Sequence, residues 1–173
     1  MLQTNLKKPH LFSKLLVFVL LLFNTNLSAQ KKQIDSLKQL LLLEITDSAK
    51  VDNLMSISRL YQSINIDSVL KYSKKTAVFS ESTNGYRLAE AYNNMGACHF
   101  YQANLDSANY YYQGALDALD KNNDSIIKSF VYCNMALMYG NLLDKEKEIA
   151  YYLKAISQVE SNDKEVCTIY YNL

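Results

Sequence analysis

Few residues in this chain are of the types that carry out chemistry, and the most regular of them are Asp-Ser pairs. The pairs begin at Asp35, Asp47, Asp67, Asp106 and Asp124. A serine nucleophile needs a base beside it, and His99, the one histidine after position 29, does not lie near any of these serines. We expect instead that the aspartates cap helices, because a carboxylate accepts hydrogen bonds from first-turn amides and stabilises the positive end of the helix dipole.

The three cysteines do not form the pattern of a metal site or of a disulfide framework. Cys98, Cys133 and Cys167 are odd in number and widely spaced, and no Cys-x-x-Cys motif or second nearby histidine completes a tetrahedral ligand set. We expect them to pack as small apolar residues, although an oxidising compartment would allow two of them to pair. We predict no catalytic residue, no metal site and no cofactor, and therefore no enzyme activity.

The elements that would position any site are repeated along the chain. A short phrase with tyrosine, asparagine and a large apolar residue occurs at Tyr92–Gly96, Tyr132–Ala136 and Tyr170–Leu173, at intervals of roughly 40 residues. The similar stretches Leu105–Leu116 and Leu143–Ile156 follow the first two copies. Periods of this size are typical of stacked helix pairs, in which one pair cannot bury its apolar face alone.

Helix is the only regular structure that the apolar pattern predicts. The chain has one proline, Pro9, and four glycines, so few residues interrupt the helical spacing of apolar side chains. The predicted helices are Gln33–Leu43, Ala49–Ser63, Asp67–Glu81, Tyr86–Ala103, Asp106–Leu119, Asp124–Asn141, Lys145–Val159 and a last one from Lys164 to the end. We therefore predict an all-α protein.

Residues 1–29 have the layout of a secretory signal peptide. Lys7, Lys8 and Lys14 precede the apolar run Leu15–Phe23, and a stretch of small residues ends at Ala29. The run is shorter than the roughly 20 apolar residues that span a bilayer, so we predict cleavage after Ala29 and export to the periplasm or the exterior. The alternative is a membrane protein anchored through an uncleaved N-terminal segment.

The charge of the chain argues against a nucleic-acid ligand. The formal net charge is +1, but the segment 1–29 holds three lysines and no acid. The remainder has 15 Lys and Arg against 17 Asp and Glu, a net charge of −2. No basic footprint is left for nucleic acid.

The repeats resemble the tetratricopeptide repeat, which places a bulky aromatic, a large apolar and a small residue in helix A, and small, aromatic and small residues in helix B. The second unit matches at Tyr92, Met95, Gly96, Ala108, Tyr112 and Ala115. The third matches at Tyr132, Met135, Ala136, Tyr139, Tyr152 and Ala155. There Glu148 stands where a small residue is expected, and we expect Ala150 to compensate. The first unit matches loosely, at Leu54, Ile57, Ser58, Tyr61, Val69, Ser73 and Thr76.

The resemblance implies a right-handed superhelical solenoid of antiparallel helix pairs, similar to exported bacterial proteins of this family. Residues 30–48 would form an N-terminal capping helix. Residues 49–173 would form an array of about three repeats and the start of a fourth. Because the third phrase stops at Leu173 without a polar capping helix, we expect the array to be truncated.

The resemblance also implies a concave groove lined by the A helices. The residue two after the leading aromatic, here Asn94, Asn134 and Asn172, would hydrogen-bond the backbone of an extended peptide. The other expected groove residues are Arg59, Asn93, Tyr101, Phe130 and Asn141, together with Met55, Gln62, Glu90, Ala97 and Leu137. With Arg59 as the only cation among them, clamping of a terminal carboxylate is not expected.

Two functions fit this organisation. The first is a non-catalytic scaffold that binds a protein or peptide in its groove, in the cell envelope. The alternative is the N-terminal sensor portion of a longer signalling protein, with a histidine kinase or a helix-turn-helix regulator as output. Contact with a membrane would come only from the signal segment or from an anchor beyond Leu173.

Overall fold

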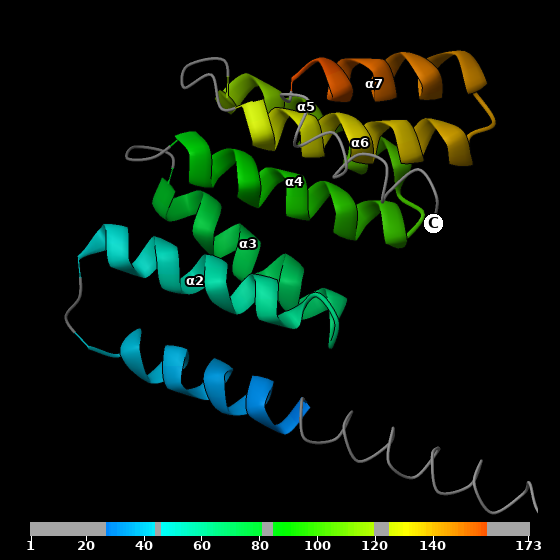
Figure 1. Cartoon of the computed structure of the whole chain (residues 1–173). Helices are drawn as coiled ribbons and strands as arrows, with labels where there is room; N and C mark the ends of the chain where they lie inside the picture. The colour runs from blue at the N-terminus through cyan, green and yellow to red at the C-terminus, as the bar shows by residue number, and fades with distance from the viewer. Residues whose placement is uncertain (1–26, 44–45, 81–84, 120–124, 159–173) are drawn as a thin grey trace, which may run out of the picture.

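The computed structural model describes residues 27–43, 46–80, 85–119 and 125–158 of the 173-residue chain. Within these ranges helix is the only regular secondary structure (Figure 1), so the all-α prediction is confirmed. The helices are residues 27–40, α2 (Asp47–Tyr61), α3 (Ile66–Ser80), α4 (Gly85–Tyr101), α5 (Leu105–Leu119), α6 (Ser125–Asn141) and α7 (Lys145–Ser157). The bounds of α2 to α7 lie within two residues of those predicted. Residues 1–26 of the expected signal, Cys167, Asn172 and the expected last helix lie outside the described residues.

The N-terminal helix begins earlier than predicted, because residues 27–32 are already helical. The expected cleavage point between Ala29 and Gln30 therefore lies within a helix. Gln30 is held against α2, where its Nε2 donates to the backbone oxygen of Leu60 at 2.7 Å. Further along, Ile34 is buried in a cluster with Leu54, Ile57 and Tyr72 of α2 and α3. The N-terminal helix thus covers the apolar side of the first helix pair.

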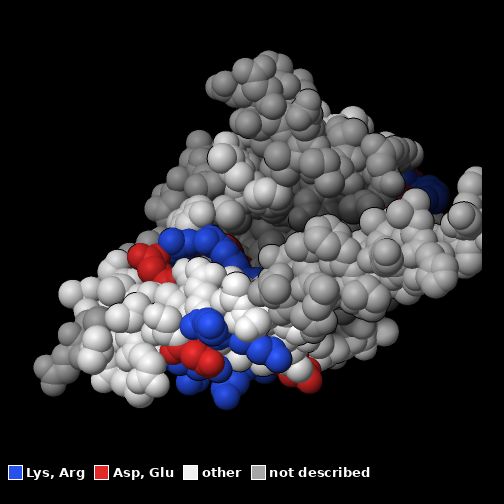
Figure 2. Space-filling view, turned by 60° about the horizontal axis from the view of Figure 1, so that its bottom comes forward, with Lys and Arg blue, Asp and Glu red and all other residues white. Residues whose placement is uncertain are grey.

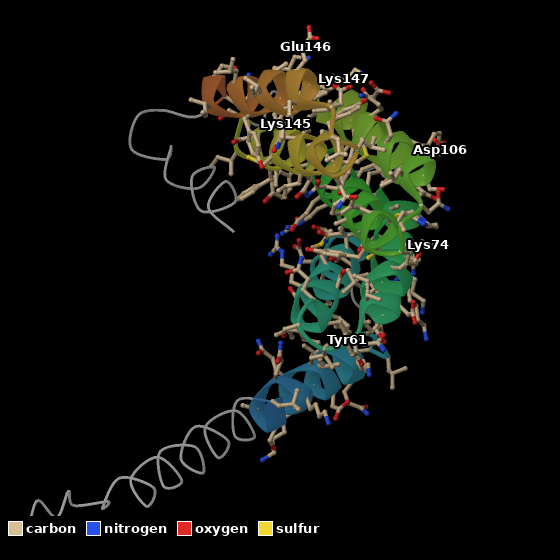
Figure 3. The ribbon with its side chains drawn as sticks, turned by 90° about the vertical axis from the view of Figure 1, so that its right-hand side faces the viewer. Tyr61, Lys74, Asp106, Lys145, Glu146 and Lys147 are labelled. Atoms are coloured by element: carbon tan, nitrogen blue, oxygen red, sulfur yellow. The ribbon has the colours of Figure 1, made fainter. Side chains whose placement is uncertain are left out.

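Each of the helices α2 to α7 packs against the next one in the chain, as Figure 1 shows. Helix α4 makes additional contacts with α2 and α6, so α2, α4 and α6 form a row. In the side view of Figure 3 the stack is bowed, with Lys74 of α3 and Asp106 of α5 on its outer side. The largest buried cluster joins α4, α5 and α6 and is centred on Tyr112, Val131 and Met135.

The expected capping by the Asp-Ser pairs is wrong in register. The side chains that accept a first-turn amide are Thr46 from Ala49 N at 3.3 Å, Asn65 from Ser68 N at 2.7 Å, Asn104 from Ser107 N at 3.1 Å and Asp144 from Lys147 N at 3.1 Å. Asp47, Asp67 and Asp106 lie one or two residues later, inside the first turn. There they still stabilise the helix dipole but cannot be the N-cap. Asp35 lies within the N-terminal helix, and Asp124 is outside the described residues.

Two of the turns between helices share an unusual backbone conformation. Ala103 and Leu143 have positive φ angles of 58° and 59°. After each, the next amide closes the end of the preceding helix: Asn104 N donates to His99 O at 2.9 Å, and Asp144 N donates to Tyr139 O at 3.0 Å. This is the Schellman pattern of a helix C-terminus. The same Asn104 and Asp144 then cap the following helix, so one residue ends one helix and begins the next.

Gly96 permits a close approach between helices α4 and α5. A Cβ placed on Gly96 would lie 2.6 Å from Cδ1 and Cε1 of Tyr112, which is 1% exposed. The reverse contact is looser, since a Cβ on Gly114 of α5 would lie 3.2 Å from Cδ2 of Tyr92. Each helix of this pair therefore contributes one glycine and one tyrosine, and each glycine faces the tyrosine of the other helix.

Glu148 is accommodated in a way the sequence analysis did not predict. A Cβ on Gly140 would lie 2.7 Å from Oε1 of Glu148, so the glycine on α6 provides the room for the carboxylate on α7. Lys145 Nζ binds the other oxygen, Oε2, at 2.6 Å. Ala150, which was expected to compensate, is exposed and takes no part.

Three stacked ring pairs recur at equivalent places in the chain. They are Tyr61 with Tyr72, His99 with Tyr111, and Tyr139 with Tyr151. Their ring centroids lie 5.7, 5.3 and 5.2 Å apart, and the planes are within 10° of parallel. Both the first and the second members of the pairs return at intervals of roughly 40 residues, as the repeated phrase does. The period seen in the sequence is therefore also a period of contacts between side chains.

The described surface carries mixed charge. None of the described helices is long and apolar enough to span a bilayer. Figure 2 shows blue and red side chains beside one another on the face that includes the N-terminal helix. Neighbouring pairs include Lys38 with Asp35 at 3.9 Å and Lys50 with Asp47 at 3.1 Å. Such exposed pairs contribute little stability but leave no large patch of one sign on this face.

Candidate functional site

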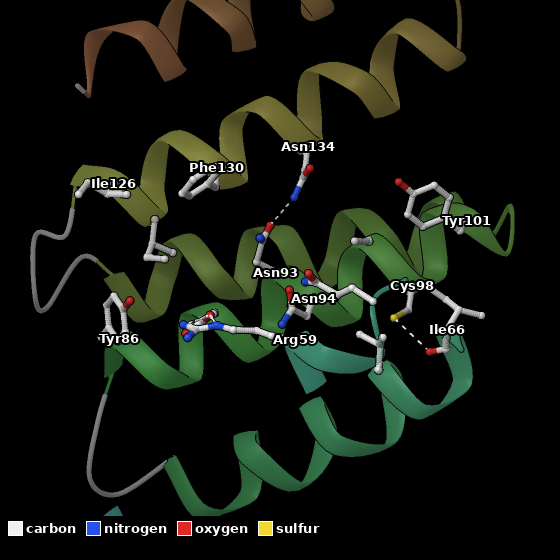
Figure 4. Close-up of a pocket in the computed structure, with 15 residues that line it drawn as sticks. Arg59, Ile66, Tyr86, Asn93, Asn94, Cys98, Tyr101, Ile126, Phe130 and Asn134 are labelled. Atoms are coloured by element: carbon white, nitrogen blue, oxygen red, sulfur yellow. Dashed lines mark hydrogen bonds and ion pairs between the residues drawn. The ribbon is translucent and has the colours of Figure 1, made fainter. Parts of the chain in front are cut away.

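A hollow of about 510 Å³ lies between α4 and α6 and extends down to α2 and α3 (Figure 4). It is lined by Arg59, Gln62, Ile66, Val69, Tyr86, Glu90, Asn93, Asn94, Ala97, Cys98, Tyr101, Ile126, Ile127, Phe130 and Asn134. We call it the α4–α6 groove. The α4 and α6 side chains reach it because residues three, four and seven apart share one face of a helix.

Most of the expected groove residues come together here. Arg59, Asn93, Asn94, Tyr101, Phe130 and Asn134 all line the groove, together with Gln62, Glu90 and Ala97. Asn141 does not, because it is the exposed last residue of α6, beyond the groove. Leu137 is also absent from the lining. Met55 was expected in the groove but is 0% exposed, since its position on α2 faces α4.

Asn94 and Asn134, the two described asparagines of the repeated phrase, differ in the acceptor of their hydrogen bond and in their exposure. Asn134 Nδ2 donates to Asn93 Oδ1 at 2.8 Å and so connects α6 to α4 across the groove (Figure 4). Asn94 is only 8% exposed, and its Nδ2 donates to Met55 Sδ at 3.6 Å. A peptide in the groove would therefore meet the Asn93–Asn134 pair, while Asn94 mainly secures α4 to α2.

Charged residues form a chain of alternating sign along one side of the groove. Arg59 Nε donates to Glu90 Oε1 at 2.7 Å, and Arg87 Nη1 binds Glu90 Oε2 at 2.9 Å. Arg87 also reaches Asp52, with Nε to Oδ1 at 2.8 Å. Glu90 is the centre of this network, with a side chain that is 10% exposed. Two arginines and two carboxylates thus balance one another before any ligand binds.

Sequence reasoning missed several residues of this site, among them Tyr86, Ile126 and Arg87. The others are lining residues of mostly apolar type: Ile66, Val69, Cys98 and Ile127. Tyr86 and Ile126 line the groove and are separated along the chain by one repeat period. Applying that period to the first turn of α4 would have revealed the pair. Arg87 precedes Glu90 by three residues, the spacing of an ion pair on a helix. Its link to Asp52, on a different helix, is visible only in the fold.

Cys98 and His99, two residues of types that often act in catalysis, both have shifted pKa values. Burial, followed by the charge of Asp67, raises the pKa of the Cys98 thiol to about 11, and the thiol donates to Ile66 O at 3.6 Å. Cys133 is a buried thiol as well. Burial and the nearby Lys74 lower the pKa of His99, whose ring is stacked on Tyr111. In the described part of the chain, His, Cys, Asp and Glu side chains form no cluster that could hold a metal ion.

Comparison with known proteins does not assign the chain to a family. No protein-family model matches it, and no curated protein sequence does either. The function must therefore be argued from the geometry of the groove.

Proposed function

We propose that this protein is a non-catalytic scaffold of the tetratricopeptide type that binds a peptide segment of a partner in the α4–α6 groove. The proposal includes the finer architecture, a solenoid of antiparallel helix pairs. Two features that recur at regular intervals support the repeat. One is the set of three stacked ring pairs. The other is the burial of small residues at equivalent positions: Ser58, Gly96 and Ala136. Stacked repeats of this kind form extended concave surfaces that suit extended ligands.

The observation that carries the binding proposal is the amide pair in the middle of the groove. The Asn134–Asn93 bond occupies one donor and one acceptor. Among the described residues, the side chains of Asn93 and Asn134 make no other hydrogen bond, so the pair keeps both donor and acceptor groups for a ligand. A peptide group needs that combination. Catalysis is not proposed, because the nearest thiol, Cys98, is protonated at neutral pH.

The proposal can be tested with a variant whose larger side chain fills the groove. Ala97 lines it on α4, and Ala97→Trp would place an indole in the hollow, whereas Ala150→Trp places the same side chain on the exposed surface of α7. We expect the full chain to retain decapeptides from a random displayed library. Ala97→Trp should weaken their binding at least about tenfold, which is about 1.4 kcal/mol, and Ala150→Trp should leave it unchanged. Circular dichroism would establish that both variants fold.

Two results would overturn the proposal. One is that the folded wild-type chain retains no peptide from the library. The other is that the two tryptophan variants bind equally well, which would place the peptide elsewhere.

We also propose that the protein works outside the cytoplasm, because the basic and apolar layout of residues 1–29 supports export. A fusion of alkaline phosphatase after residue 158 should be active in a bacterial host. Loss of that activity when Leu15–Phe23 is interrupted by charged residues would be the expected control, and activity unaffected by it would contradict export by this segment.

A further inference from the structure

The charges of the α4–α6 groove bear on the kind of peptide it can take. Only two of the lining residues, Arg59 and Glu90, are charged at neutral pH, and they bind each other. Glu90 is also bound by Arg87, and Arg87 in turn binds Asp52. A carboxylate brought to Arg59 would add a second anion beside Glu90. The groove therefore offers no uncompensated charge, and a charged ligand would lose hydration without gaining a partner.

One end of the groove is apolar. Tyr86 and Ile126 come from the first turns of α4 and α6, and Phe130 lies one turn further along α6 (Figure 4). Ile126 remains 53% exposed at the edge of this hollow. A large aliphatic or aromatic side chain placed there would bury the exposed surface of Ile126, and removal of apolar surface from water favours binding.

The amide pair lies next to this apolar end. Asn134 follows Phe130 by one helical turn, and Asn93 follows Tyr86 by two turns, so both amides lie deeper along the same groove. Their remaining donor and acceptor suit the N–H and C=O of one peptide group in an extended segment. An apolar side chain at Ile126 and a backbone amide at Asn93 and Asn134 can therefore belong to the same short segment.

We infer that the groove recognises an internal, uncharged peptide segment that carries one large apolar side chain, rather than a chain terminus or an acidic sequence. This inference rests on the proposed peptide binding and specifies its ligand. Tyr86, Ile126 and Phe130 receive the side chain, and Asn93 and Asn134 hold the backbone. The paired Arg59 and Glu90 exclude ligands with charge at this place.

The experiment compares two random decapeptide libraries on the full chain. In one library the decapeptides are internal and flanked by Gly-Ser linkers, and in the other they end in a free carboxylate. We expect binders from the internal library, enriched in a single Leu, Ile, Phe or Tyr and depleted in Asp and Glu. For a selected peptide, a change of its apolar residue to Ser should raise Kd at least about tenfold, whereas amidation of its C-terminus should change Kd less than about twofold.

A matched pair of protein variants locates the contact. Ile126→Ser should raise Kd at least about tenfold, while Ile149→Ser, at a 58% exposed isoleucine on α7 outside the groove, should have no effect. A requirement for a free carboxylate or for acidic residues would overturn the inference, and so would equal effects of the two serine variants. If either of these results were found but Ala97→Trp still blocked binding, peptide binding in the groove would stand and only the inference about the ligand would be wrong. If Ala97→Trp had no effect on binding, the proposed function and the inference about its ligand would both be wrong.

Discussion

Gly96 and Gly114 face the same pair of helices but differ in how much room a side chain would have. The Cβ of an alanine at 96 would lie 2.6 Å from the ring of Tyr112, and that ring is almost fully buried, so moving it would disturb the core around it. The Cβ of an alanine at 114 would lie 3.2 Å from Tyr92, which is only partly buried. Both glycines are in helices, where alanine is favoured intrinsically by about 1 kcal/mol.

We predict that Gly96→Ala lowers the free energy of unfolding, and that Gly96→Leu lowers it further, by about 1–3 kcal/mol through overpacking. Gly114→Ala should be neutral or stabilising, because its small clash is offset by the better helix propensity. Urea denaturation followed by circular dichroism measures all three. A stabilising Gly96→Ala would mean that α4 and α5 are not as close as the structure has them.

The asparagines show that one residue type at one repeat position can have different tasks. Asn94 and Asn134 occupy the same place in two copies of the repeated phrase, yet Asn94 is buried on Met55 and Asn134 reaches Asn93. Each amide donates to the preceding helix of the row, at the residue three before the small residue, which is Met55 for Asn94 and Asn93 for Asn134. Both asparagines line the groove, and repeat position alone does not decide how far each one is buried or which side chain it bonds.

At the scale of the elements, the helices are joined by turns that carry backbone strain at two positions. Ala103 and Leu143 have φ angles of 58° and 59°, a conformation that costs most residues about 1–2 kcal/mol and glycine almost nothing. Leu143 is 82% exposed, so its side chain contributes little burial in exchange.

We predict that Leu143→Gly stabilises the protein by about 1 kcal/mol, because it removes the strain and keeps the Schellman hydrogen bonds. Leu142→Gly, one residue earlier and without a positive φ, is the matched control and should destabilise the protein or leave it unchanged. The midpoint of urea unfolding distinguishes the two. A lower midpoint for Leu143→Gly than for the wild type would show that this turn is not strained.

The N-caps of the helices are a second feature of the turns, and the sequence pattern placed them one or two residues too late. The Asp-Ser pattern was visible because aspartate is favoured throughout the first turn, not only at its first position. Asn65 and Asn104 precede these aspartates and make the capping bonds. In the sequence both positions look alike, and only the φ and ψ angles of the chain decide which residue is the cap.

At the scale of the whole molecule, contacts run mainly between consecutive helices, so stability is not expected to be uniform. Helix α4 contacts α2, α3, α5 and α6, whereas α7 contacts only α6 among the described helices α2 to α7. Helix α7 also buries just two side chains, Tyr152 and Ala155. Local opening of α7 therefore breaks fewer contacts than opening of α4.

We predict that amide hydrogens of α4 exchange at least about tenfold more slowly than those of α7 under native conditions, a difference of about 1.4 kcal/mol. Hydrogen exchange read by mass spectrometry on peptides from the two helices provides the measurement. Equal exchange free energies in α4 and α7 would instead show that the chain opens as one cooperative unit.

Local patterns in the sequence are enough to predict the helices and much of what they bury. Apolar spacing and the scarcity of proline and glycine placed α2 to α7 within two residues, because both signals are local along the chain. The resemblance to a known repeat, not the period itself, placed Gly96 at a small-residue position and most of the groove residues on the A helices.

The pairing of these side chains across helices could not be predicted from the sequence and follows from how the helices pack. The bond from Asn134 to Asn93, the link from Arg87 to Asp52, the room that Gly140 gives Glu148 and the burial of Met55 all join different helices. Such contacts depend on how far each helix is rotated and shifted against its neighbour, and a local pattern does not contain that information. Periodicity therefore assigns the face of a helix, whereas packing decides which residues on that face meet a ligand and which meet the next helix.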